Sequence, residues 1–241
     1  MFKSTKLACV FVLCLAAVLV LASCGQDSSG SKTFYIPSDA LTAPTFEIRG
    51  YANIFFASTD NNIVQYVYEE ALLDGLPDGA KIIGMRLQPY SASSGFPEWA
   101  DDTVSQFEVR LSTSENEPDS LSNTFSENRG ADEVFVIPET SWNIVADDYH
   151  NDECQALIAA EVTPCAFGPF IRFANPFVYA GGSILMEVAS VGFTNATPNT
   201  LQAFTPGGDV YTVFEATSFD DARIGTLQDT NLPYIAFVYT D

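Results

Sequence analysis

Phe107-Glu-Val-Arg-Leu-Ser-Thr113 is the stretch of this chain that most clearly indicates a β-strand. The apolar side chains of Phe107, Val109 and Leu111 fall on one side, and the polar side chains of Glu108, Arg110 and Ser112 fall on the other. This period of two is typical of a strand that packs one face on a core and turns the other face to water. We therefore start from a sheet and work outward from this strand.

A polar segment, residues 114–132, separates this strand from a second apolar run, Val134-Phe-Val-Ile137. The second run is apolar at every position, which is typical of a strand that is buried on both faces. We predict that it lies in the centre of its sheet, and that the long loop between the two strands carries much of the protein's specificity.

Three pieces of this region form a pattern: Arg110-Leu-Ser-Thr-Ser114, Pro118-Asp-Ser-Leu-Ser-Asn-Thr-Phe125 and Asn128-Arg-Gly-Ala-Asp132. The pattern is similar to one that recurs in exported bacterial proteins, many of which carry a C-terminal PEP-CTERM sorting tag. Weaker similarity lies at residues 64–72, 83–87, 170–179 and 183–188. The resemblance implies an extracellular β-rich domain and brings no catalytic residue with it. It does not extend to the tag, because no second apolar helix and no basic tail follow Thr226.

Residues 1–23 have the order of parts found in a bacterial signal peptide. Lys3 and Lys6 precede an almost purely apolar run, residues 7–21, which is short for a membrane span. The run ends in Leu21-Ala-Ser-Cys24, which resembles the lipobox of bacterial lipoproteins. We predict that Cys24 is lipidated and anchors the protein in the lipid bilayer. The alternative is an ordinary signal peptide with a chance cysteine.

Residues 24–33 are rich in Gly and Ser and predict a short flexible tether after the lipidated cysteine. Residues 34–241 then suit one large domain. The expected location is the cell envelope, lipid-anchored, and the outer membrane or cell surface if the cell is Gram-negative, because Gly25 and not Asp follows Cys24.

Acidic residues outnumber basic residues by 31 to 10. Removal of the signal peptide takes Lys3 and Lys6 away, so that 31 acidic residues face 8 basic ones and the formal charge is −23. Such a surface repels phosphate backbones, so we expect no nucleic-acid partner.

Short strand candidates recur along the domain, with Gly and Pro in nearly every gap. They lie at residues 45–49, 53–57, 63–68, 81–88, 170–179, 183–191, 201–204, 210–216, 223–227 and 234–239, besides the two above. Many short strands with hardly any helix predict an all-β fold, a single β-sandwich that is jelly-roll-like. The strand at 234–239 must be paired to avoid an exposed apolar edge, so we expect it inside a sheet.

One helix is predicted, over residues 152–161, where Asp152 could cap it and Pro164 would stop it. Cys154 and Cys165 are the cysteines that remain beside Cys24 after processing, and in an oxidising compartment we expect them to form a disulfide. A helix that ends near Ala159 would let the chain double back far enough for the bond.

The chain offers little that indicates catalysis. His150 is the only histidine, and although Asp147 and Asp148 precede it, no Gly-x-Ser-x-Gly elbow accompanies it. Phosphate-binding and dinucleotide-binding glycine motifs are absent from the sequence. Carboxylates are numerous, but no spacing singles out a pair that would face each other across a cleft, as glycoside hydrolysis requires. We expect no catalytic residue.

Two further groups are candidate sites. Oxygen ligands for a structural calcium ion come from the long loop: Asp119, Asn123, Asn128, Asp132 and Glu133. The alternative for these residues is turn formation and capping. Tyr90, Phe96 and Trp99 form an aromatic group that could stack on sugars, or fold inward as a lid on the core.

These features together predict a membrane-anchored extracytoplasmic β-sandwich lipoprotein that acts as a non-catalytic surface or envelope interaction module. Its partner would be an extracellular glycan or another envelope protein, and it would need no cofactor other than the calcium ion. The alternative is a carbohydrate-active protein, either a glycan-binding module or a glycoside hydrolase.

Overall fold

The computed structural model describes residues 30–38, 40, 50–52, 62–89, 100–149, 167–194, 201–204, 212–214, 226–229 and 232–241. The chain from Lys32 to Asp241 forms one compact unit. Several predicted features lie outside the described residues: Cys24, the helix at 152–161 with the Cys154–Cys165 pair, His150, and the aromatic group of Tyr90, Phe96 and Trp99. For these residues the sequence-based expectations stay predictions.

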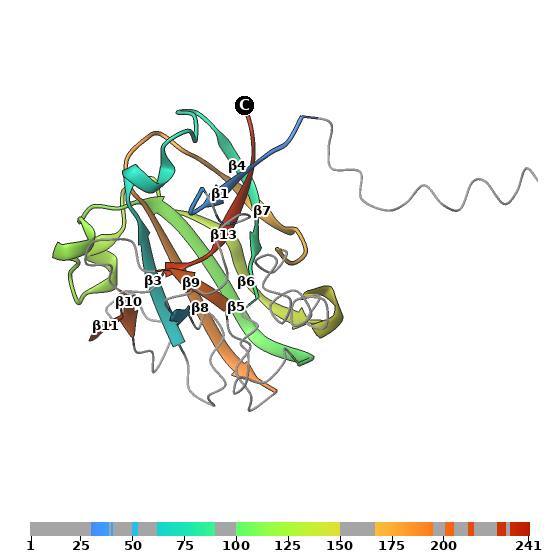
Figure 1. The fold of residues 1–241 in the computed structure, drawn as a ribbon. Coiled ribbons are helices and arrows are strands. Elements are labelled where there is room, and N and C mark those ends of the chain that lie inside the picture. The colour runs from blue at the N-terminus through green and yellow to red at the C-terminus, as the bar shows by residue number, and fades with distance from the viewer. Residues whose placement is uncertain are drawn as a thin grey trace, which may run out of the picture. The chain divides into compact units, whose positions relative to one another are not determined.

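Two four-stranded antiparallel sheets make up most of the domain (Figure 1). The first sheet has the strand order β1 (Lys32–Ile36), β13 (Ile235–Thr240), β4 (Lys81–Leu87) and β7 (Ile171–Val178). The second has the order β3 (Asn62–Tyr68), β8 (Ile184–Phe193), β5 (Asp102–Thr113) and β6 (Val134–Ile144). Numbered along the chain, these eight strands give the orders 1-8-3-6 and 2-7-4-5, which is jelly-roll topology. The predicted all-β sandwich is confirmed.

Shorter elements complete the described chain. β2 (Gly50–Ala52), β9 (Leu201–Phe204) and β12 (Leu232–Pro233) form a three-stranded sheet, and β10 (Thr212–Phe214) pairs with β11 (Thr226–Asp229). Four short 3-10 helices lie at η2 (Glu70–Leu73), η3 (Pro118–Ser120), η4 (Phe125–Asn128) and η5 (Ala146–Tyr149). None of the helices in this part of the chain has the length and apolarity that a membrane crossing needs.

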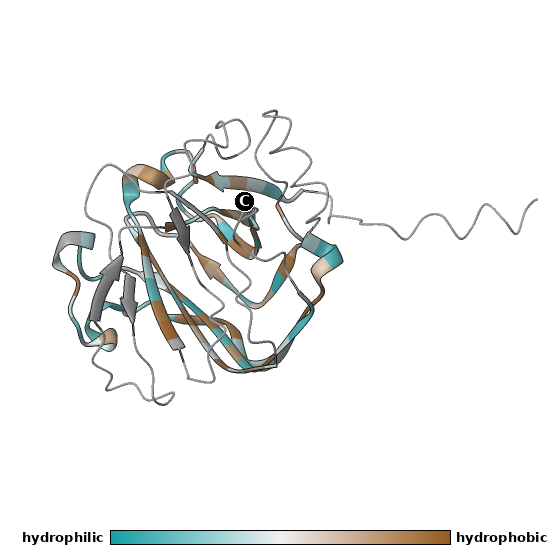
Figure 2. Ribbon diagram, turned by 60° about the horizontal axis from the view of Figure 1, so that its bottom comes forward, coloured by the Kyte–Doolittle hydropathy of each residue, from teal (hydrophilic) through white to brown (hydrophobic). Residues whose placement is uncertain are grey.

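The core lies between the two large sheets and is built from the alternate side chains of their strands. β3 and β8 contribute Tyr66 and Met186 from one sheet, and β4 and β13 contribute Met85 and Phe237 from the other, all of them fully buried. Brown and teal segments accordingly alternate along the strands in Figure 2. The last strand, β13, lies between β1 and β4, as we expected for an apolar strand that closes the chain.

Two expectations for the central region need correction. β6 is an edge strand and not a central one, and its Phe135 is 40% exposed. Pro138 in β6 and Pro176 in β7 withhold backbone donors on the two edge strands that pack against each other. The polar face of β5 is also not wet, because Glu108 and Ser112 are both buried.

The domain begins slightly earlier than predicted. β1 starts at Lys32, two residues before the expected boundary at Phe34, and Lys32 pairs with Tyr239 of β13. The Lys32 Nζ atom lies 2.7 Å from a carboxylate oxygen of Asp241. Polar residues at a strand start resemble a tether in sequence, and here the C-terminal strand supplies the partner that orders them.

Candidate functional site

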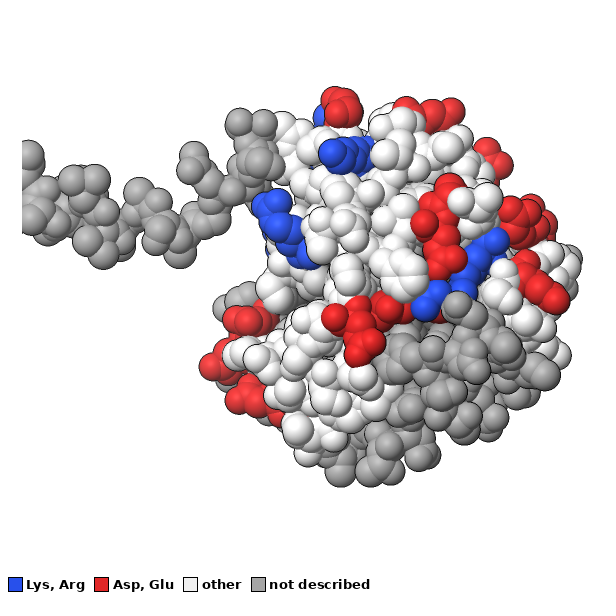
Figure 3. Space-filling model, turned by 180° about the vertical axis from the view of Figure 1, so that it is seen from behind, with Lys and Arg blue, Asp and Glu red and all other residues white. Residues whose placement is uncertain are grey.

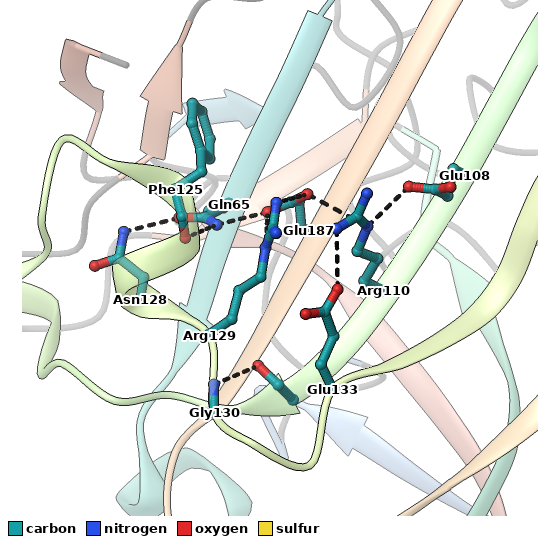
Figure 4. Close-up of polar contacts among 10 residues, drawn as sticks. Gln65, Glu108, Arg110, Phe125, Asn128, Arg129, Gly130, Glu133 and Glu187 are labelled. Atoms are coloured by element: carbon teal, nitrogen blue, oxygen red, sulfur yellow. Dashed lines mark hydrogen bonds and ion pairs between the residues drawn. The ribbon is translucent and has the colours of Figure 1, made fainter. Parts of the chain in front are cut away.

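Polar side chains cross the outer face of the second sheet in register. Gln65 in β3 is paired with Glu187 in β8, and Glu187 is paired with Arg110 in β5. Their neighbours along each strand point into the core, so these three side chains lie on the opposite face. We call Gln65, Glu187 and Arg110 the polar row; Figure 4 shows it with its partners.

Glu187 is the centre of the polar row. Its carboxylate accepts hydrogen bonds from Arg129 Nε at 2.9 Å and Arg129 Nη2 at 2.8 Å, which is the bidentate geometry of a strong ion pair. Gln65 Nε2 donates a further bond to Glu187 Oε2 at 2.6 Å. The side chains of Glu187 and Arg129 are only 1% and 7% exposed, so this ion pair is shielded from solvent.

Arg110 joins the row to two more carboxylates. Its Nε donates to Glu108 Oε1 at 2.8 Å and its Nη1 donates to Glu133 Oε1 at 2.9 Å. The guanidinium also lies over the ring of Phe135, with 4.2 Å between its central carbon and the ring centroid. Burial raises the pKa of Glu108, the hydrogen bond and charge of Arg110 lower it in part, and the charges of Glu187 and Glu139 raise it further.

Residues 114–133 form a loop, here called the cap, which covers this face. Asn128 in η4 is fully buried and uses its whole side-chain amide. Its Nδ2 donates to Gln65 Oε1 at 2.9 Å and to the Ser122 carbonyl at 2.8 Å. Its Oδ1 accepts from Asn116 Nδ2 at 2.9 Å and from the Ser122 backbone N–H at 2.7 Å. Asn128 therefore fixes the shape of the cap and its contact with the sheet.

The cap also has an apolar contact with the sheet. Phe125 packs on Ile63 of β3 and Ala189 of β8, and all three are buried in a small cluster separate from the main core. The Phe125 carbonyl accepts a second bond from Gln65 Nε2 at 2.9 Å. The cap is thus held by an aromatic side chain, an amide and an ion pair.

The end of the cap turns sharply at Gly130. The Gly130 N–H donates to the Thr113 carbonyl at 2.8 Å, and a Cβ atom at Gly130 would lie only 2.6 Å from that carbonyl oxygen. Asp132 accepts from the Thr113 N–H at 2.8 Å and from the Thr113 hydroxyl at 2.7 Å. Glycine is required here for close approach, and Asp132 ties the end of β5 to the return of the chain.

The five predicted calcium ligands differ in their contacts and in their exposure. Asn128 is saturated by hydrogen bonds, Asp132 binds Thr113, and Glu133 pairs with Arg110. Asn123 is exposed and Asp119 lies in η3. Within the described ranges, no three His, Cys, Asp or Glu side chains gather in a way that could hold a metal ion. Calcium binding stays a prediction, and the contacts agree with the alternative of turn formation and capping.

A separate open hollow of about 460 Å³ lies beside η2. Glu70, Asp74, Asp78 and Tyr179 are among its lining residues. Burial raises the pKa of the Tyr179 hydroxyl, and the negative charges of Glu70 and Asp78 add to this. That hydroxyl donates to the Gly182 carbonyl at 2.9 Å. The hollow contains no residue of the polar row or the cap.

Sequence reasoning singled out the cap but missed the residues that it binds. Gln65 and Glu187 lie within the weakly similar outlying segments, and Arg129 lies in the central motif. A polar residue in the middle of each of two apolar runs, residues 63–67 and 184–189, was the available signal, because such a residue needs a partner when it is buried. Comparison with known protein families, with characterised proteins and with solved structures finds no match for this chain.

Proposed function

We propose that this protein is a lipid-anchored extracytoplasmic β-sandwich that acts as a non-catalytic interaction module of the cell envelope. The observation that carries the proposal is that the charged side chains of the sequence motif at residues 110–132 bind to other residues of the same chain. Arg110, Arg129 and Asp132 are each bonded to other residues of the chain. They hold the cap on the sheet, which is a structural task.

The contacts of the buried acids support the non-catalytic part of the proposal. A general acid or a nucleophile must reach substrate. Glu187 is instead covered by the cap and doubly bonded to Arg129, and Glu108 is bonded to Arg110. A carboxylate in a tight ion pair has its charge and its lone pairs already in use.

The anchoring part rests on the N-terminal sequence and has a direct test. Cys24→Ser should move the protein from the membrane fraction to the soluble fraction and abolish uptake of labelled palmitate. Cys14→Ser is the matched control, because Cys14 lies within the apolar run of the predicted signal peptide, and it should change neither readout. A Cys24→Ser variant that still pellets with membranes and still takes up label would refute the anchor.

The absence of catalysis is tested with a broad panel of chromogenic glycosides and esters on the purified full chain. The proposal expects no turnover above the background of a heat-denatured sample. Reproducible turnover that is abolished by replacing one carboxylate or His150, with an unchanged melting temperature, would establish the carbohydrate-active alternative or another hydrolase.

A further inference from the structure

The basic side chains of the described residues divide into two groups. Lys32, Arg110 and Arg129 each have a carboxylate within 2.9 Å. Lys81, Arg86 and Arg172 lie on β4 and β7, and within the described part of the chain they form no ion pair. In a chain with 31 acidic and 10 basic residues, three cations on neighbouring strands that have no carboxylate partner among the described residues are unexpected. Figure 3 shows one group of blue side chains interleaved with red ones and others in mostly uncharged surface.

Arg86 and Arg172 share one aromatic ring. Their guanidinium carbons lie 5.8 Å and 5.4 Å from the centroid of Phe170. Arg86 Nη1 also donates to the Gly168 carbonyl at 3.2 Å, while Arg172 is exposed. Cation–π contact orients both groups without neutralising them. Two guanidinium forks are thereby held near each other.

The position of Phe170 depends on Gly84. Gly84 of β4 is paired with Arg172 of β7, and a Cβ atom at Gly84 would lie 2.2 Å from the Phe170 ring. The missing side chain leaves room for the ring over the outer face of the first sheet. The cluster of Arg86, Phe170 and Arg172 is thus built into the strand pairing and is not a chance approach of long side chains.

The cationic face continues along the same two strands. Lys81 is exposed and lies about 10 Å along β4 from Gly84. Its partner in register is Val178 of β7, which is 55% exposed. An exposed apolar side chain next to a cation adds a surface that a sugar ring can cover. Cations that are spread over about 10 Å of these two strands fit a chain of repeating units better than a single small anion.

We propose that the Arg86–Phe170–Arg172 cluster binds a carboxylated polysaccharide, with uronate carboxylates on the guanidinium groups and sugar rings against Phe170. Arginine forks match carboxylates in bidentate geometry. The formal charge of −23 that remains after signal-peptide removal repels an extended anionic membrane surface. A single polysaccharide strand, in contrast, meets only this local positive face. The proposal goes beyond the envelope module described above and does not depend on lipidation of Cys24.

The test measures binding of a galacturonic acid hexamer to the full chain in detergent by isothermal titration calorimetry. The fully methyl-esterified hexamer is the matched ligand control, because it has the same rings without the charges. We expect binding of the acid form only, and affinity that falls with salt. Arg172→Gln should weaken binding at least fivefold, and Arg86→Gln with Arg172→Gln at least tenfold. Lys32→Gln, which removes a cation outside the cluster, should leave affinity unchanged.

Arg172 is exposed, so Arg172→Gln keeps the proposal testable if the double variant does not fold. The proposal is overturned if the acid hexamer does not bind, or if Arg172→Gln binds like the unmodified protein. An equal loss in Lys32→Gln would also overturn it, since that result indicates general charge attraction. Arginine-dependent binding of glycerol 3-phosphate in place of the hexamer would reject the polysaccharide in favour of a lipid headgroup.

Discussion

Glu187 in the middle of β8 and Arg129 in the cap are 58 residues apart in the chain and meet through two hydrogen bonds of 2.8 and 2.9 Å. The strand presents the acid on the outer face of the sheet, and the cap brings the base over it. Because both side chains are almost fully buried, neither can exchange its partner for water. The pair therefore couples the position of a loop to the register of a sheet.

Replacement of Glu187 should be strongly destabilising. Glu187→Gln leaves the buried guanidinium of Arg129 without its countercharge, and loss of one partner of a buried pair costs about 3–5 kcal/mol. For a domain of this size the melting temperature should fall by on the order of 10 °C. Glu117→Gln, an exposed acid in the cap, is the matched control and should have little effect.

A double variant distinguishes the contribution of the ion pair to stability from the contribution of general packing. Glu187→Gln combined with Arg129→Gln removes both charges, so its destabilisation should be smaller than the sum of the two single effects. Thermal unfolding of the four proteins gives this difference directly. Additive effects, or a Glu187→Gln variant that melts with the Glu117→Gln control, would show that the pair does not stabilise the cap.

In contrast to the charge of Glu187, the charge of Glu108 should lower the stability of the fold at neutral pH. Burial raises its folded-state pKa above the value of about 4.3 expected in the unfolded chain. Between these two pKa values the folded state binds more protons, so stability falls as pH rises through this window. Arg110, Glu139 and Glu187 are the charged groups that act on Glu108, and Glu133 pairs with the same Arg110.

Glu108→Gln removes this titration while an amide oxygen can still accept from Arg110. The free energy of unfolding of the variant minus that of the unmodified protein should therefore grow as pH rises from 4, and level off above the raised folded-state pKa of Glu108. Denaturant unfolding at several pH values measures this difference, in which the other carboxylates largely cancel. A difference that is flat, or that becomes more negative with rising pH, would contradict the assigned direction.

The strands were predictable because their pattern is local. Alternation, together with Gly and Pro in the gaps, indicated β3, β4, β7 and β8, and β9 falls at the predicted residues. The place of β6 was not predictable in this way. Phe135 looks like a core residue in sequence, but its neighbour across the strand pair is the guanidinium of Arg110, which covers the ring without burying it.

The candidate site was predictable only in part, because its contacts are not local. The cap was visible as a polar loop with turn-forming residues. Its partners Gln65 and Glu187 are 122 residues apart, and period-two reasoning assigns an outward polar residue to solvent. Only strand order and register reveal that both lie under one loop. Glu187 within an otherwise apolar run is the residue that could have indicated this.

Asp132 provides the sharpest distinction between capping and calcium binding by the cap. Its carboxylate accepts both bonds from Thr113, so Asp132→Ala should lose about 1–2 kcal/mol of stability and lower the melting temperature by several degrees. If capping is its task, this loss is the same in calcium and in chelator. Asn123→Ala is the matched variant, because Asn123 is a predicted ligand that is exposed. Capping predicts no effect of Asn123→Ala. If calcium raises the melting temperature of the unmodified protein but not that of either variant, the ion site is established instead.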